Sequence, residues 1–174
     1  MPSRDLGFYL NKASQAHPTT EGYVGQSGYF SAPQASLDTH IFGQDNKLLP
    51  DVRASLINYF MNWCGRVGYK FPTNWTKLFL AGSGASYQWA EARGNGDLDI
   101  LLGFDYVQFV EDNPQFQGLS ESDVADYVNA EMHADLWPTT ANTDFNGQVY
   151  EVTYYLNPHT GMDIRNIQDR KSVV

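Results

Sequence analysis

Two aspartates one residue apart are the side chains of this chain best suited to chemistry. Asp97 and Asp99 lie in the sequence Gly-Asp-Leu-Asp-Ile-Leu-Leu (residues 96–102). If this segment is an extended strand, alternate side chains share a face, so both carboxylates point to one side while the apolar side chains enter a core. Neighbouring carboxylates repel each other unless a cation neutralises them, and hard oxygen ligands suit magnesium or manganese. The spacing therefore predicts a metal site on one face of a strand.

The segments before this pair predict how the chain reaches it. Residues 77–81 (Lys-Leu-Phe-Leu-Ala) are mostly apolar and predict a buried strand, which the glycines of residues 82–84 interrupt. Gly94-Asn95-Gly96 is a strong turn sequence that leads into a strand over residues 97–104. We expect the two strands to pair as neighbours, with a short helix starting near Ser86 between them.

Two helices are expected beside the sheet. Apolar residues recur at helical spacing between Pro50 and Gly68, which predicts an amphipathic helix of about 16 residues that covers one face of the sheet. Pro50 and Asp51 suit its first turn, and Gly68 can end it. Downstream, Ser120 and Asp123 form a capping-box sequence, which predicts a second helix that ends before Trp137-Pro138.

A later segment supplies a third acid. Residues 148–156 alternate between two kinds of side chain, which predicts a strand with Glu151 and Thr153 on the same face. Asp144 and Asp163 are the alternatives if Glu151 faces solvent. Strands interleaved with helices indicate the α+β class, with a mixed β-sheet and helices packed on it.

The chain is expected to hold one folded domain behind an N-terminal arm. Its 174 residues suffice for one substantial core and are few for two. Residues 1–36 are rich in Gly, Ser, Gln and Pro with scattered aromatic residues, which predicts an extended or flexible arm. Residues 37–174 are the predicted domain. Two alternatives stay open for the arm: a flexible tail, or a segment that docks on the domain or on a protein partner.

Composition narrows the function classes. The formal net charge of -9 at pH 7 disfavours extended duplex nucleic acid as a partner, because phosphate contacts need clustered Lys and Arg. No stretch reaches the ~20 apolar residues of a membrane span, so we expect no membrane partner and a soluble, cytoplasmic protein. The lone Cys64 is expected to be an inert core thiol. The histidines at positions 17, 40, 133 and 159 lack metal-ligand spacing, and we expect structural roles for them, although His133 could approach the site.

The glycine turn, the Asp-Leu-Asp strand and the later acid together resemble the signature of the polymerase beta-like nucleotidyltransferase superfamily. In that family a Gly-Ser or Gly-Gly turn is followed, after a variable gap, by an Asp-hydrophobic-Asp strand, and a neighbouring strand supplies a third carboxylate. The resemblance covers roughly residues 76–156, and the chain looks most like small stand-alone or phage-encoded members. Gly96 stands where a Ser commonly precedes the first Asp.

The resemblance implies a metal-dependent nucleotidyltransferase with this core fold. Such an enzyme moves a nucleoside monophosphate from a nucleoside triphosphate, such as ATP, to a hydroxyl acceptor on a nucleic-acid end, a small molecule or a protein, and releases pyrophosphate. Asp97, Asp99 and Glu151 would be catalytic and would bind Mg2+ or Mn2+. The nucleotide-binding candidates lie in the turn and in the loop after it: Gly82, Ser83, Ser86 and Arg93.

Other interpretations of the same residues fit less well. A calcium loop would need a ligand and a glycine where Leu101 and Leu102 stand. A phosphate-binding loop would need Gly-Lys-Ser/Thr after Gly82, and a dinucleotide fingerprint would need a glycine at Tyr87. A metal-dependent glycosyltransferase also uses Asp-x-Asp but leaves the Gly-Ser turn unexplained. One alternative stays open: a catalytically degenerate copy of the fold that acts as a binding or viral structural module.

Overall fold

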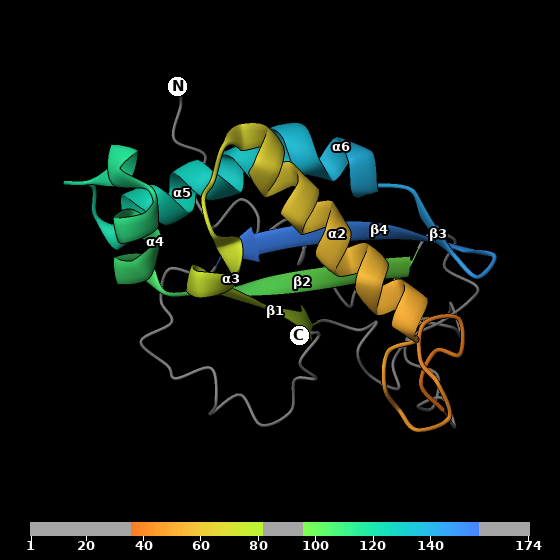
Figure 1. The fold of residues 1–174 in the computed structure, drawn as a ribbon. Helices are drawn as coiled ribbons and strands as arrows, with labels where there is room; N and C mark the ends of the chain where they lie inside the picture. The colour runs from red at the N-terminus through yellow and green to blue at the C-terminus, as the bar shows by residue number, and fades with distance from the viewer. Residues whose placement is uncertain (1–35, 82–95, 157–174) are drawn as a thin grey trace, which may run out of the picture.

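A four-stranded mixed sheet forms the centre of the fold (Figure 1). The computed structural model describes residues 36–81 and 96–156. The strand order is β1-β2-β4-β3, with β1 antiparallel to β2, β4 parallel to β2, and β3 antiparallel to β4. The strands are β1 (Thr76–Ala81), β2 (Gly96–Phe104), β3 (Thr143–Phe145) and β4 (Gln148–Leu156). The predicted α+β class with a mixed sheet is therefore confirmed.

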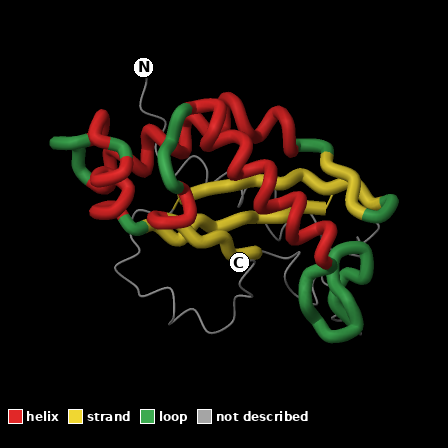
Figure 2. Tube along the Cα trace, in the orientation of Figure 1, coloured by secondary structure: helices red, strands yellow, loops and turns green. Residues whose placement is uncertain are grey.

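The helix α2 (Pro50–Val67) crosses one face of the sheet, as Figure 2 shows in red against yellow strands. Its ends follow the sequence: Pro50 occupies the first turn, where no N–H is needed, and Asp51 adds a negative charge there. Gly68 ends the helix with a left-handed backbone at φ 86°, and its N–H donates to the Cys64 carbonyl. The predicted helix is confirmed, and it is 18 residues long.

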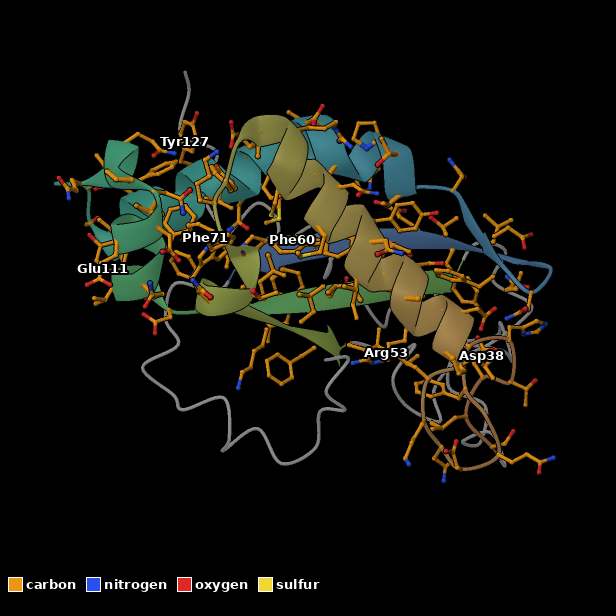
Figure 3. The ribbon with its side chains drawn as sticks, viewed as in Figure 1. Asp38, Arg53, Phe60, Phe71, Glu111 and Tyr127 are labelled. Atoms are coloured by element: carbon orange, nitrogen blue, oxygen red, sulfur yellow. The ribbon has the colours of Figure 1, made fainter. Side chains whose placement is uncertain are left out.

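The core lies between α2 and the sheet. Phe60 points from α2 toward the strands in Figure 3, and its ring stacks on that of Tyr154 of β4 with centroids 6.1 Å apart. The Tyr154 hydroxyl donates to the Leu56 carbonyl at 2.6 Å, which ties the strand to the helix backbone. Burial raises the pKa of Tyr154, because the charged phenolate is costly in an apolar surrounding. Cys64 of α2 is buried, as predicted, and burial raises the pKa of its thiol to about 12.

A second aromatic cluster lies at the end of the sheet where β1 begins and β2 ends. The short helix α3 (Pro72–Trp75) leads into β1, and α4 (Tyr106–Asp112) follows β2. Trp75 packs edge-on against Phe109 of α4, with ring centroids 4.8 Å apart and planes at 87°. Asp105 caps α4 by accepting the Gln108 N–H at 3.0 Å. These contacts fix the two antiparallel strands at one end.

A helical segment lies along the outer edge of β4 (Figure 1). It consists of α5 (Glu121–Glu131), a π-helical turn η5 (Met132–Leu136) and α6 (Trp137–Thr140). The predicted capping box of Ser120 and Asp123 opens α5. The predicted end before Trp137-Pro138 is wrong, because helical structure continues to Thr140. Pro138 falls in the first turn of α6, where its missing N–H costs nothing, and the π turn joins the two helices.

Side chains of this segment pair with the backbone of β4 where β3 has ended. Asn129 accepts the Leu156 N–H at 2.7 Å and donates to the Leu156 carbonyl at 2.9 Å. Thr140 donates its hydroxyl to the Val152 carbonyl at 2.8 Å. All of these groups are buried, so the side chains replace the hydrogen bonds that a further strand would make. The position of β4 is therefore fixed on both sides.

The described chain before α2 packs against the domain. Leu37, Ile41 and Phe42 are buried in the core, and Phe42 forms a β-bridge with Leu48.

A 3-10 helix, η4 (Pro114–Phe116), precedes α5. The predicted N-terminal arm lies outside the described residues except for Ser36, as do the predicted glycine turns around residues 82–84 and 94–95. No helix in the two described ranges is long and apolar enough to cross a membrane.

Candidate functional site

The alternation of β2 places Asp97 and Asp99 on the face opposite Leu98, Ile100 and Leu102, as predicted, although the buried Leu101 shares the face of the two acids. Leu98, Ile100 and Leu102 are buried beneath α2, whereas Asp97 is exposed and Asp99 is half-buried on the other face. The two carboxylates are therefore on one face, with α-carbons about 6.6 Å apart for two residues of strand. This is the face opposite the packed helix.

Glu151 lies on the strand next to the two aspartates. The register of β2 and β4 pairs Asp97 with Glu151 and Asp99 with Thr153. Adjacent strands are about 4.8 Å apart, and register partners share a face, so the backbone brings three acids to one patch of the sheet. Of the alternatives, Asp144 is exposed on β3, where its carboxylate accepts the Gly147 N–H of the hairpin turn. Asp163 lies outside the described residues.

The last described residue before the predicted phosphate-binding turn is Ala81. Ala81, the residue immediately before Gly82, is the register partner of Asp99. The chain therefore leaves β1 directly beside the acidic patch. The nucleotide-binding candidates themselves, Gly82, Ser83, Ser86 and Arg93, lie outside the described residues.

A side chain at position 96 would meet a steric obstacle. A Cβ built on Gly96 would lie 2.9 Å from Cδ1 and 3.0 Å from Cε1 of Tyr150. The Tyr150 ring cannot move freely, because its hydroxyl donates to Asp38 at 2.5 Å. The Asp38 carboxylate is itself buried and receives the His40 backbone N–H at 3.0 Å. A serine at position 96 would therefore collide with a ring that is anchored at its far end.

This Asp38 cluster was missed in the sequence. His40 completes it, with Nδ1 2.8 Å from Asp38 Oδ1, and the Asn146 amide donates to the His40 carbonyl at 2.8 Å. The cluster joins the segment before α2 to the β3–β4 hairpin, and Figure 3 shows Asp38 near the start of α2. The structural role expected for His40 agrees with this geometry. A short Asp-x-His sequence with no periodic context gave no signal for it.

Trp137 is a second residue that the sequence did not reveal. Its indole Nε1–H donates to Glu151 Oε1 at 2.9 Å. His133 stacks on the same indole with ring centroids 5.3 Å apart and planes at 4°. His133 therefore does approach the predicted third acid, through the tryptophan that lies between them. The available signal was a histidine four residues before a tryptophan, a spacing that puts both side chains on one side of a helix.

The three acids have the ligand chemistry that a divalent cation needs. Carboxylate oxygens are the ligands that magnesium and manganese prefer. Within residues 36–81 and 96–156, however, no three His, Cys, Asp or Glu side chains come close enough together to hold one ion. The Glu151 carboxylate is hydrogen-bonded to Trp137 in this arrangement. Joint binding of one ion by all three acids would therefore require these side chains to move.

Negative charge is concentrated on one part of the molecule. The segment from residue 105 to residue 136, which forms α4, η4, α5 and η5, contains eight Asp or Glu residues and no Lys or Arg. One of these acids, Asp135, is paired with Arg66 of α2 at 2.9 Å. Such a surface repels nucleic-acid phosphates over a Debye length of about 8 Å at physiological salt.

Comparison of the chain with protein-family models, curated proteins and solved structures finds no match.

Proposed function

We propose that this protein is a metal-dependent nucleotidyltransferase that transfers a nucleoside monophosphate from a nucleoside triphosphate to a hydroxyl acceptor. One observation carries the proposal: Asp97 and Glu151 are register partners on adjacent parallel strands, and Asp99 shares their face. Three acids on one face repel one another, and a bound cation offsets that repulsion. The exit of β1 beside Asp99, directly before Gly82, supports phosphate binding next to these acids.

The residues of the chain have separate roles in this scheme. Asp97, Asp99 and Glu151 bind Mg2+ or Mn2+, which when bound offsets charge on the triphosphate and lowers the pKa of the attacking hydroxyl. Gly82 and Ser83 hold phosphate oxygens through backbone N–H groups and a hydroxyl. The acceptor oxygen bonds to the α-phosphorus, the bond between the α-phosphorus and its bridging oxygen breaks, pyrophosphate leaves, and the hydroxyl proton passes to solvent.

The charge of the surface limits the acceptor. The acidic segment of residues 105–136 disfavours extended duplex nucleic acid, because duplex binding depends on neutralising many phosphates with Lys and Arg. A small molecule, a protein hydroxyl or a single nucleic-acid end makes few phosphate contacts and meets no such barrier. These acceptors are the ones we propose.

The test is transfer of radiolabel from an α-labelled nucleoside triphosphate in the presence of magnesium. Candidate acceptors are offered as pools of small hydroxyl compounds, proteins and oligonucleotides. The expected result is labelled product with the wild-type chain and none with the Asp97→Ala, Asp99→Ala double variant. Glu111→Gln is the matched control, because Glu111 is an exposed acid on α4, away from the sheet. Equal labelling by the double variant would contradict the proposal.

A non-catalytic module is the second candidate. It is favoured by the observation that no three acidic, histidine or cysteine side chains in the described ranges gather closely enough to hold an ion. A degenerate copy of the fold would bind neither Mn2+ nor a nucleoside triphosphate, and it would co-purify with a protein partner. Calorimetric titration with Mn2+ and a non-hydrolysable triphosphate separates the two candidates.

A further inference from the structure

The Glu151 carboxylate has a defined partner on the neighbouring helix. Within the described residues, the hydrogen bond from Trp137 Nε1–H, at 2.9 Å, is the only one that its side chain receives. Glu151 is half-buried, so this bond is partly shielded from water. A carboxylate has about four acceptor positions on two oxygens, so one N–H leaves most of its binding capacity for a cation.

Three features of the helical segment that carries Trp137 restrict the position of its indole ring. The π turn η5 changes the hydrogen-bond pattern, so that the Trp137 backbone N–H donates to the Met132 carbonyl, five residues earlier. Turns of this kind occur mainly as single insertions in helices, often at functional sites. His133 stacks face to face on the indole, which limits rotation of the ring. The Thr140 bond to the Val152 carbonyl then holds the end of α6 on β4, one residue from Glu151.

From this arrangement we infer that Trp137 is the positioning residue for Glu151: its indole N–H fixes one carboxylate oxygen and orients the other toward the face that carries Asp97 and Asp99. The inference rests on the proposed function to the extent that Glu151 binds a cation. Groups that hydrogen-bond a metal ligand usually contribute 10–100-fold to metal affinity or activity. Loss of the N–H should therefore weaken metal binding even though Trp137 never touches the ion.

The first measurement tests whether the indole N–H signal of Trp137 changes when the metal ion binds. The indole N–H signals of the wild-type protein are followed by 15N NMR during titration with Mg2+ and a non-hydrolysable nucleoside triphosphate. The signal of Trp137 is assigned as the one that is missing from the spectrum of Trp137→Phe. We expect the Trp137 signal to move on titration and also in Glu151→Ala, while the signals of the buried Trp63 and Trp75 stay in place. A Trp137 signal that is unmoved by Glu151→Ala would overturn the inference.

The second measurement is the affinity for Mn2+ in the presence of the same triphosphate. Trp137→Phe keeps an aromatic ring beside His133 but is smaller and lacks the indole N–H, and we expect the dissociation constant for Mn2+ to rise about tenfold. Trp75→Phe is the matched control, because it removes an indole N–H that donates to the Lys70 carbonyl far from the acids. We expect no change in affinity for this control.

A double variant separates positioning from a general loss of structure. In a Glu151→Gln background the charged ligand is already gone, so adding Trp137→Phe should change the Mn2+ affinity less than twofold. A purely structural role would instead give the same tenfold loss in both backgrounds, and this result would overturn the inference.

Different experimental results would overturn the inference and the proposed function. Nucleotide transfer with unchanged Mn2+ affinity in Trp137→Phe overturns the inference alone. A tenfold loss of Mn2+ affinity without any transfer by the wild-type chain supports the inference and overturns the proposed function. A wild-type chain that binds no Mn2+ overturns both.

Discussion

Gly96 offers a sharp test of how the start of β2 is packed. Replacing it with alanine adds a Cβ that would lie 2.9 Å from Tyr150 Cδ1, whereas ordinary van der Waals contact begins at 3.4 Å. The ring must therefore move by about 0.5 Å, the difference between these two distances. Movement is costly because the hydroxyl of the same ring is hydrogen-bonded to the buried Asp38 at 2.5 Å.

The expected magnitude follows from the two ways in which the ring can respond. If the ring stays, the overpacked contact costs about 1–3 kcal/mol. If it moves, the hydrogen bond to Asp38 is stretched or lost, and a bond to a carboxylate contributes about 1.5–3 kcal/mol. We therefore expect Gly96→Ala to lower the free energy of unfolding by about 2 kcal/mol. Because the response with the lower free-energy cost is the one that occurs, we do not expect the loss of unfolding free energy to be much above 3 kcal/mol.

Urea unfolding of four proteins measures this effect and its cause: wild type, Gly96→Ala, Tyr150→Phe and the double variant. Without its hydroxyl the ring is released, so Gly96→Ala should cost less than about 1 kcal/mol in the Tyr150→Phe background. Gly65→Ala is the control, because Gly65 is exposed in α2 with nothing within 4 Å of its added Cβ. That change should stabilise the protein by about 0.5–1 kcal/mol. Additive losses for Gly96→Ala and Tyr150→Phe would refute the reasoning.

Three further predictions concern the rest of the fold and site. Asn129→Leu leaves the N–H and carbonyl of Leu156 buried and unpaired and should cost about 2–4 kcal/mol in urea unfolding, whereas the exposed Asn62→Leu should cost less than about 0.5 kcal/mol. The pKa of Cys64 is raised from 9.0 to about 12, so the stability it contributes is present well below pH 9 and is lost as the pH rises toward 12. Between pH 9 and pH 10 the loss should be about 1 kcal/mol, and Cys64→Ala should flatten this part of the profile. Saturating Mn2+ should stabilise the wild-type chain by about 2.7 kcal/mol at 100 times its dissociation constant, and an equal shift in Asp97→Asn would contradict a site at that residue.

Local patterns in the sequence identified the elements that carry the site. Alternation predicted the strands around Asp99 and Glu151, and it also predicted which residues share a face. Capping residues predicted α2 and the start of α5, because Gly68 and Ser120 satisfy backbone groups that a helix end leaves unpaired. These features depend on neighbours within a few residues, so they can be inferred without the tertiary structure.

The sequence predicted that the strands of residues 77–81 and 97–104 are neighbours, which the structure confirms, but the register between strands could not be inferred in the same way. Alternation fixes the face of a strand and leaves its neighbour and register open, so the pairing of Asp97 with Glu151 is visible only in the structure. The helix α4 was missed although Asp105 is a recognisable cap, because seven residues give a weak periodic signal. The continuation of the second helix past Pro138 depends on a π turn, which has no known sequence pattern here.

The contact between Trp137 and Glu151 was also beyond the reach of the sequence. It joins residues on two elements whose relative position depends on the hydrogen bonds of Asn129 and Thr140 to the edge of β4. Each of these bonds joins residues that are far apart in the sequence. The sequence alone therefore indicated which acids could be catalytic. The structure indicated that Trp137 hydrogen-bonds one of them, Glu151.

The most direct test of the account is a crystal structure of the protein soaked with Mn2+ and a non-hydrolysable nucleoside triphosphate, with anomalous diffraction data to locate the metal. The account predicts a manganese peak bound by carboxylate oxygens of Asp97, Asp99 and Glu151, with the triphosphate beside the end of β1. A peak bound elsewhere, or a sheet face that holds no manganese at saturating concentration, would contradict it.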